Sequence, residues 1–220
     1  MNEPWFQVFE CTNQDCRLRF STDLSVDHFD RCPICHSPMS KIGEPYTNYR
    51  VVNQESRKIS RSLTLVLDNL RSTLNVGSIF RTADGAGVAH IYCGGTTPTP
   101  EHPKMKKTSL GAESLTSWSY YPNSVQLISD MKAAGSMILA LESTQQSVSL
   151  FDLPFDVKQQ VRPLTLVVGN EISGIDPGIL KIADYILHIP MSGKKTSLNV
   201  AVSVGVALYT LQYLSANAIK

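Results

Sequence analysis

Four cysteines near the start of the sequence have the spacing of a metal-binding site. They form two short-spaced pairs separated by a loop, in the pattern C-x4-C-x15-C-x2-C, and comprise Cys11, Cys16, Cys32 and Cys35. Each pair can place two thiolates on one tight turn, and folding can bring the two turns together as a tetrahedral site. A reducing cytoplasm argues against two disulfides, and so small a segment needs a cross-link, such as a bound metal ion, to fold alone. The pattern therefore predicts a zinc site. Iron in a rubredoxin-like site, free thiols and disulfides are the alternatives.

Three polar clusters farther along the chain each follow a short apolar run. They are residues 75–81 (NVGSIFR), 168–174 (VGNEISG) and 189–199 (IPMSGKKTSLN). Taken singly, each has an ordinary structural explanation, because asparagine and serine often cap helices and glycines often form turns. The glycine patterns of dinucleotide-binding and phosphate-binding loops are incomplete in this sequence, and no hydrolase-like grouping of histidine, acid and nucleophile occurs. The three clusters are therefore the candidate reaction site.

The elements that must position these clusters alternate along the chain from residue 63 onward. Short apolar runs predict strands, and the stretches between them predict helices. The strands are expected at 63–67, 90–93, 137–141, 164–168 and 185–189, and the helices at about 75–84, 123–134, 176–183 and 198–214. This alternation predicts an α/β fold with a mostly parallel sheet covered on both faces. Each cluster then lies at the carboxyl edge of a strand, where ligands collect in open α/β sheets.

The last predicted helix, 198–214, is rich in Val, Ala and Leu nearly all round. A surface helix needs only one apolar stripe, so we expect this helix to be buried on two sides, against its sheet and against a partner chain.

Charge and composition divide the sequence into two parts. Residues 1–45 carry seven acidic and four basic side chains, a net charge of −3, and the remainder carries sixteen basic and twelve acidic ones, a net charge of +4. Residues 40–62 show little strand periodicity. We therefore expect a four-cysteine module at 1–45, a linker at 46–62 and a larger domain at 63–220. The mildly basic larger part permits RNA binding without demonstrating it.

Membrane insertion and secretion are not expected from the sequence. No apolar run approaches the roughly eighteen residues of a membrane helix, and the N-terminus has neither the basic start nor the apolar block of a signal peptide. The expected location is the cytoplasm.

Taken together and in this order, the three clusters resemble the three motifs of the SpoU–TrmH branch of the SPOUT methyltransferases. The family patterns are roughly N-x-G-x-x-x-R, then G-x-E-x-x-G, then I-P-M-x-G followed by S-L-N. Residues 107–113 (KTSLGAE) also fit, and the resemblance covers about residues 63–214. One departure is Ile172, where the family usually has glycine after the acid of its second motif.

The resemblance implies a deep trefoil knot in the C-terminal part of the chain and an obligate homodimer. It also implies S-adenosylmethionine, bound in a bent form by the knot loops. On matching positions, the implied cofactor contacts are Gly169, Ile189 and Leu198, mainly through backbone groups, with Leu141 added to the same wall. The implied polar residues of the reaction site are Asn75, Arg81, Glu171, Ser197 and Asn199.

The chemistry implied by the resemblance is methyl transfer to a ribose 2′-hydroxyl. Such an in-line displacement depends mostly on positioning the acceptor oxygen near the methyl group. The family view makes Arg81 the proton acceptor, but a guanidinium keeps its proton above about pH 12. We therefore expect Arg81 to bind the neighbouring phosphate of the RNA through two parallel hydrogen bonds. Asn75 and Glu171 then fix its orientation, while Ser197 and Asn199 line the pocket.

The expected function is that of an S-adenosylmethionine-dependent 2′-O-methyltransferase acting on tRNA or rRNA, with a structural zinc module that helps to select the RNA. Two alternatives remain: a SPOUT enzyme that methylates a base, and a catalytically inactive RNA-binding dimer that has kept the fold.

Overall fold

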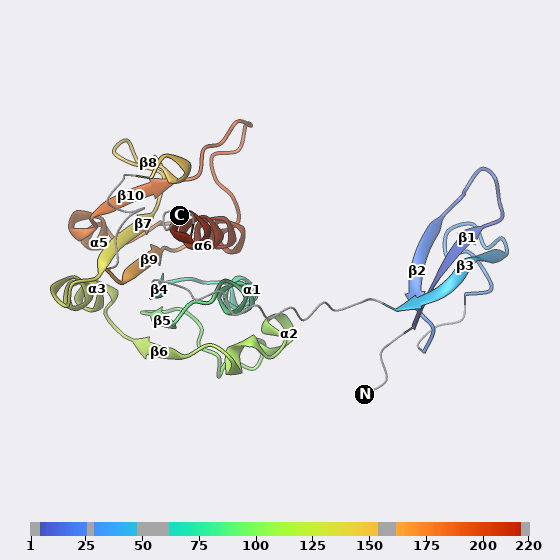
Figure 1. The fold of residues 1–220 in the computed structure, drawn as a ribbon, viewed down its shortest axis with the longest axis horizontal. Helices are drawn as coiled ribbons and strands as arrows, with labels where there is room; N and C mark the ends of the chain where they lie inside the picture. The colour runs from blue at the N-terminus through green and yellow to red at the C-terminus, as the bar shows by residue number, and fades with distance from the viewer. Residues whose placement is uncertain (1–4, 26–28, 48–61, 154–161, 217–220) are drawn as a thin grey trace. The chain divides into compact units, whose positions relative to one another are not determined.

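The computed structural model describes residues 5–25, 29–47, 62–153 and 162–216. The chain divides into two compact units, Met1–Ser56 and Arg57–Lys220. Figure 1 shows both units along the chain. Among the described helices, none has the length and apolar character needed to cross a membrane.

The N-terminal unit is built on a small antiparallel sheet with the strand order β2-β1-β3. Its strands are β1 (Trp5–Cys11), β2 (Arg19–Asp23) and β3 (Met39–Thr47). Phe9 of β1 packs against Phe20 and Phe29, with ring centroids 6.4 and 6.2 Å away. Three aromatic rings make a very small core, so this unit depends on a further cross-link for stability.

The sequence-based assignment of residues 40–62 is wrong at its start, because residues 40–47 form most of β3. The pairing with β1 shifts in register between Phe6 and Val8, whose partners are Tyr46 and Ile42. Gly43 lies in the shifted segment with a φ of +67°. This irregularity interrupts the two-residue alternation that marks a strand. The strand ends at Thr47, two residues inside the predicted linker, and residues 48–61 lie outside the described residues.

The larger unit contains a seven-stranded sheet in which every pair of neighbouring strands is parallel. Its strand order is β6-β5-β4-β9-β7-β10-β8. The strands are β4 (Leu63–Asp68), β5 (His90–Gly94), β6 (Trp118–Tyr121), β7 (Met137–Leu141), β8 (Val148–Ser149), β9 (Leu164–Val168) and β10 (Tyr185–His188). The predicted parallel sheet is confirmed, and the sequence analysis missed only the short edge strands β6 and β8 of this sheet.

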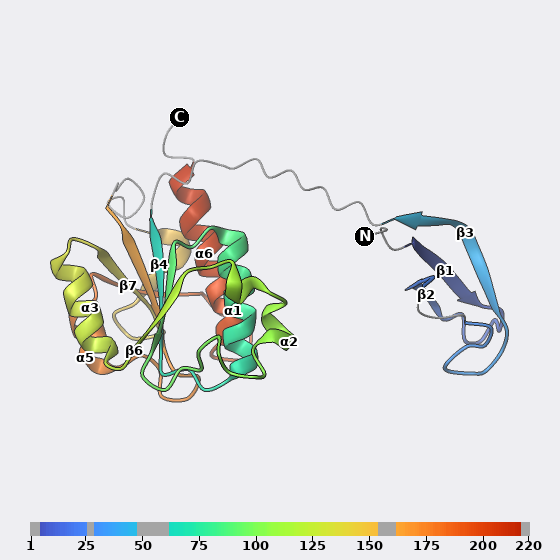
Figure 2. The ribbon, with the colours of Figure 1, turned by 90° about the horizontal axis from the view of Figure 1, so that it is seen from below.

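Helices cover both faces of this sheet, as Figures 1 and 2 show. They are α1 (Thr73–Ala86), α2 (Lys106–Ser109), α3 (Ser124–Ala133), α5 (Pro177–Ile182) and α6 (Val200–Ala216), with 3-10 turns at Ala112–Ser114 and Leu150–Asp152. Leu65 and Leu67 of β4 pack on the side of α1 and α6, whereas Val66 packs on the side of α3 and α5. Burial on both faces explains why the strand sequences are continuously apolar.

The apolar helix α6 is buried on one side only within the single chain. Val204 and Leu208 are completely buried in the core beside α1. Val202 and Tyr209, on the other side, are 52% and 42% exposed. The expected packing against the sheet is therefore confirmed, and the second apolar side faces outward in the single chain.

Candidate active site and metal centre

A cavity of about 510 Å³ opens at the carboxyl ends of β7, β9 and β10. All the predicted cofactor contacts line it: Leu141, Gly169, Ile189 and Leu198. Four of the five predicted reaction-site residues line it as well: Asn75, Glu171, Ser197 and Asn199. Segments more than 100 residues apart in sequence thus meet at the sheet edge where open α/β folds bind ligands.

A chain of hydrogen bonds joins the three motifs at this cavity. The Asn75 side chain donates from Nδ2 to Glu171 Oε1 at 3.0 Å, and Asn199 Nδ2 donates to Asn75 Oδ1 at 3.1 Å. Asn75 is free for this role because the hydroxyl of Ser72 caps α1 instead, accepting from the Asn75 backbone N–H. Asn75 is therefore not the cap of α1.

The Glu171 carboxylate lies at the N-terminal end of α1. Its oxygens also accept hydrogen bonds from the backbone N–H groups of Arg71 at 2.9 Å and Ser72 at 3.2 Å. Partial burial raises the pKa of Glu171, but the N–H donors of Arg71, Asn75, Ser72 and Glu171 itself together lower it by more, so the pKa lies below its ordinary value. Glu171 is therefore a fixed anion at neutral pH.

The turn that carries Glu171 is held tightly against the end of β9. Asn170 and Gly174 exchange two backbone hydrogen bonds of 3.1 and 2.9 Å. The Asn170 side chain donates to the Asn69 carbonyl at 2.7 Å. A Cβ atom added to Gly169 would lie 2.3 Å from the Ile175 nitrogen, so only glycine fits there. Ile172, the departure from the family pattern, is 77% exposed and leaves this bonding intact.

The third motif forms the outer wall of the cavity and leads into α6. Ser197, Leu198 and Asn199 are exposed at the cavity. Asn199 also stabilises the start of the helix, because its Oδ1 accepts from the Ala201 N–H at 2.9 Å. One side chain thus links the beginning of α6 to Asn75 of α1.

Arg81 does not line this cavity within the single chain. It lies on α1 six residues after Asn75, and its side chain is exposed. Six residues turn a helix by about 600° and advance it by about 9 Å, so the two side chains leave α1 in directions about 120° apart. The two residues share a sequence motif, but the geometry of the helix directs their side chains apart.

Two titratable residues that the sequence analysis missed also line the cavity: Glu142 and His188. Glu142 directly follows β7, and His188 is the last residue of β10. Their position at the carboxyl ends of predicted strands is the signal that could have identified them.

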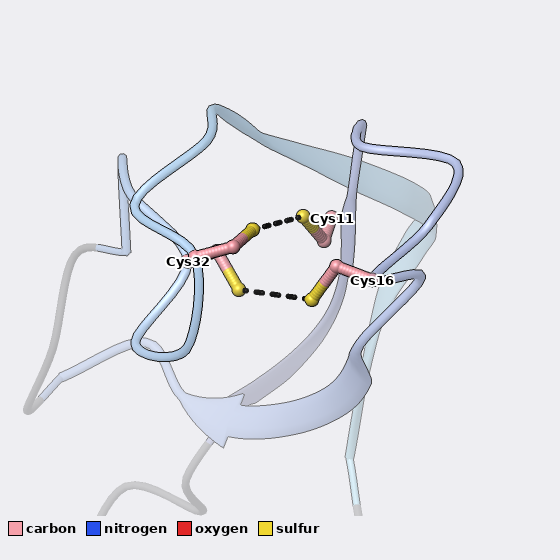
Figure 3. A group of neighbouring side chains, drawn as sticks. Cys11, Cys16 and Cys32 are labelled. Atoms are coloured by element: carbon pink, nitrogen blue, oxygen red, sulfur yellow. Dashed lines mark hydrogen bonds between the residues drawn. The ribbon is translucent and has the colours of Figure 1, made fainter.

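The four predicted metal ligands of the N-terminal unit lie together. The sulfur atoms of Cys11, Cys16, Cys32 and Cys35 all lie within 4.8 Å of one another, and Figure 3 shows the labelled thiols directed at a common centre. The Sγ–Sγ distances are 3.4 Å for Cys11–Cys35 and 3.7 Å for Cys16–Cys32. Tetrahedral Zn–S bonds of about 2.3 Å require sulfurs about 3.8 Å apart. The donor set and its size therefore fit a zinc ion.

Comparisons with known proteins identify the larger unit. The SpoU rRNA Methylase family profile matches residues 62–209. A tRNA (guanosine(18)-2′-O)-methyltransferase from Aquifex aeolicus is 33% identical over 162 residues, which cover 70% of this chain and 71% of that protein.

Solved structures give the same result. The crystal structure of an A. aeolicus TrmH/SpoU tRNA modifying enzyme aligns with a TM-score of 0.64 and 30% identity, covering 72% of this chain and 77% of that one. An AdoMet-bound rRNA methyltransferase from Sinorhizobium meliloti aligns with a TM-score of 0.64 and 27% identity over 69% of this chain and 56% of that one. The family predicted from the three motifs and the α/β fold class predicted from the alternation of strands and helices are confirmed, and this chain belongs to the SpoU rRNA Methylase family.

Proposed function

We propose that this protein transfers a methyl group from S-adenosylmethionine to a ribose 2′-hydroxyl of tRNA or rRNA. The observation that carries the proposal is the hydrogen-bonded chain Glu171–Asn75–Asn199, because it places polar groups from all three motifs beside one cavity. The names of the relatives from A. aeolicus and S. meliloti support both classes of RNA substrate.

The residues that line the cavity suit the cofactor in their chemistry. Gly169 lets the backbone of the Glu171 turn approach the end of β9 closely. Leu141, Ile189 and Leu198 supply apolar surface for an adenine ring. These four residues would hold the cofactor, which when bound supplies an electrophilic methyl group.

The polar residues orient the substrate. Glu171 fixes the Asn75 amide, and Asn75 in turn fixes the Asn199 amide, so both amides present donors and acceptors in set directions. Ser197 adds a hydroxyl on the same wall. Preorganised groups of this kind hold a ribose oxygen in line with the methyl group, which is the main requirement of the reaction.

Arg81 lies on the exposed face of α1, and its planar guanidinium binds a phosphate of the RNA substrate. The neighbouring exposed side of α6, with Val202 and Tyr209, is the surface that a second copy of the chain covers in the proposed homodimer. The trefoil knot implied by the family resemblance stays a prediction for the C-terminal part of the chain.

The N-terminal unit is a structural zinc module. Four thiolates close the coordination shell and leave no position for a substrate. In the proposed enzyme this module, residues 1–45, helps to select the RNA. The protein works in the cytoplasm, where free thiols and RNA coexist.

Methylation of RNA in vitro tests the proposed function. The full chain is incubated with labelled S-adenosylmethionine and RNA from cells that lack the gene, and the labelled RNA is digested with alkali. A 2′-O-methyl group blocks cleavage at its own linkage, so the label is expected in an alkali-resistant dinucleotide. Label released in a mononucleotide would indicate the alternative, a base methyltransferase. Absence of labelling together with absence of cofactor binding would indicate an inactive RNA-binding dimer.

A further inference from the structure

Glu142 holds the only carboxylate besides that of Glu171 among the described residues that line the cavity. It belongs to none of the three motifs. Its Oε2 accepts a hydrogen bond from the Ile175 N–H at 3.1 Å, and its Oε1 accepts one from the Ser143 N–H at 3.0 Å. Two backbone donors on different loops thus hold this carboxylate in one place.

Packing also holds Glu142 in place. Gly174 lies beside it with a φ of +74°, and a Cβ atom added to Gly174 would come within 2.5 Å of Glu142 Oε2. The carboxylate therefore lies directly against the turn that carries Glu171. Each of its oxygens has a second lone pair that the two backbone donors leave unused, so Glu142 can still act on a ligand in the cavity.

The side chains around the cavity carry unbalanced charge. Two carboxylates line it, and the described lining residues include no lysine or arginine. Glu171 already accepts hydrogen bonds from three N–H groups, whereas Glu142 accepts only two, one of them from the adjacent residue. A cavity with this lining favours a ligand that carries positive charge.

The proposed cofactor and its product differ in charge at one atom. S-adenosylmethionine carries a positive sulfonium, whereas S-adenosylhomocysteine is a neutral thioether at the same sulfur. We infer that the Glu142 carboxylate is a specificity-determining group, which favours the cationic cofactor over the neutral product. The inference rests on the proposed function, and it gives the enzyme a way to exchange spent cofactor for fresh cofactor.

Calorimetry on the full chain tests this role with three ligands: S-adenosylmethionine, S-adenosylhomocysteine and sinefungin, which carries an ammonium in place of the methylsulfonium. Glu142→Gln keeps the shape and a carbonyl acceptor for Ile175 but removes the charge. We expect it to weaken binding of the two cationic ligands by about tenfold, the scale on which one nearby opposite charge acts. Binding of the thioether should change by less than about twofold. Glu101→Gln, which removes an exposed carboxylate absent from the cavity lining, is the matched control and should change none of the three.

A second variant and the wild-type protein complete the test. Glu142→Asp keeps the charge and shortens the side chain, so it should lower all three affinities while keeping the preference for cations. In the wild type, added salt should weaken the cationic ligands more than the thioether.

Equal losses for all three ligands in Glu142→Gln would show that Glu142 only shapes the turn, and would overturn the inference. Equal salt dependence for the three ligands would overturn it as well. A wild-type protein that binds none of the three would refute the proposed function itself, which is a separate outcome.

Discussion

Replacing Gly169 with alanine should damage the cofactor cavity through a single methyl group. The new Cβ atom would lie 2.3 Å from the Ile175 nitrogen, 2.4 Å from the Gly174 carbonyl carbon and 2.5 Å from its oxygen. All three are backbone atoms, so no side chain can rotate away. Real Cβ atoms keep at least about 3.0 Å from such neighbours, and the turn must retreat by roughly 0.7 Å.

The free-energy cost of displacing this turn depends on the packing and the hydrogen bonds that the turn makes. Overpacking of this kind costs about 1–3 kcal/mol, and each kcal/mol lowers the melting temperature of a domain of this size by about 2–4 °C. The retreat also disturbs the bond between Glu142 and Ile175 and the paired bonds between Asn170 and Gly174. Because Glu142, Asn170 and Gly174 line the cavity, we expect the affinity for S-adenosylmethionine to fall by about tenfold or more.

Thermal melting and calorimetry measure both effects, and Gly193→Ala is the matched control. Gly193 lies in the third motif, its φ is not in the left-handed region, and an added Cβ would meet nothing within 4 Å. This control should keep the wild-type affinity and melt at the same or a slightly higher temperature. If Gly169→Ala matched the wild type in both measurements, the steric argument for this turn would be refuted.

Four further predictions concern other parts of the protein. Cys32→Ser should abolish binding of about one zinc per chain, measured by elemental analysis, and should remove the NMR dispersion of the N-terminal unit, because metal binding and folding are coupled in so small a unit. Arg81→Ala should lower turnover by roughly 10²-fold in a methylation assay without changing the affinity for the cofactor. Arg81→Lys should restore little of the lost turnover, because an ammonium group cannot bind a phosphate in a bidentate manner. Near-normal methylation by either variant would contradict the role assigned to Arg81. Val202→Asp should shift the protein from dimer to monomer in light scattering, whereas an unchanged mass would place the dimer contact elsewhere. The pKa of Glu171 is lowered in the folded protein, so the ionised carboxylate contributes its full stabilisation above about pH 4.5 and loses it as the pH falls through the lower folded pKa. The difference in unfolding free energy between wild type and Glu171→Gln, measured by urea titration, should therefore shrink below about pH 4.5. A difference that stays constant with pH would argue against the hydrogen bonds of Glu171 described above.

Sequence reasoning worked where local pattern and burial agree. The strands Met137–Leu141 and Leu164–Val168 were predicted with their observed bounds, because both faces of these strands are buried and their residues are continuously apolar. The prediction failed at β3, where the register is irregular and no residue is fully buried, so the sequence shows no apolar alternation.

The residues of the candidate site were likewise predicted only in part. The motif spacing located Asn75, Glu171 and Asn199, and the structure joins them by hydrogen bonds. Arg81 was grouped with the cavity because it shares a motif with Asn75, although six residues on a helix turn the two side chains about 120° apart. The position of Glu142 directly after a predicted strand could have identified it as a lining residue, but a single sequence does not reveal its contacts with Ile175 and Gly174 of a distant loop.

The place of β9 beside β4 in the centre of the sheet has a consequence for the order in which the protein folds. Leu65 of β4 pairs with Ile91 of β5, 26 residues away, but also with Leu166 of β9, 101 residues away. Two doublings of loop length raise the entropic cost of closure by about 1.2 kcal/mol, and long-range pairings of this kind slow folding. The unit formed by β4, α1 and β5 can therefore assemble while the ribosome is still synthesising the chain, and the edge of β4 that pairs with β9 stays unpaired until β9 has been made. Asn75 is in place early, whereas Glu171 arrives only with β9, so the cavity is among the last parts of the molecule to form.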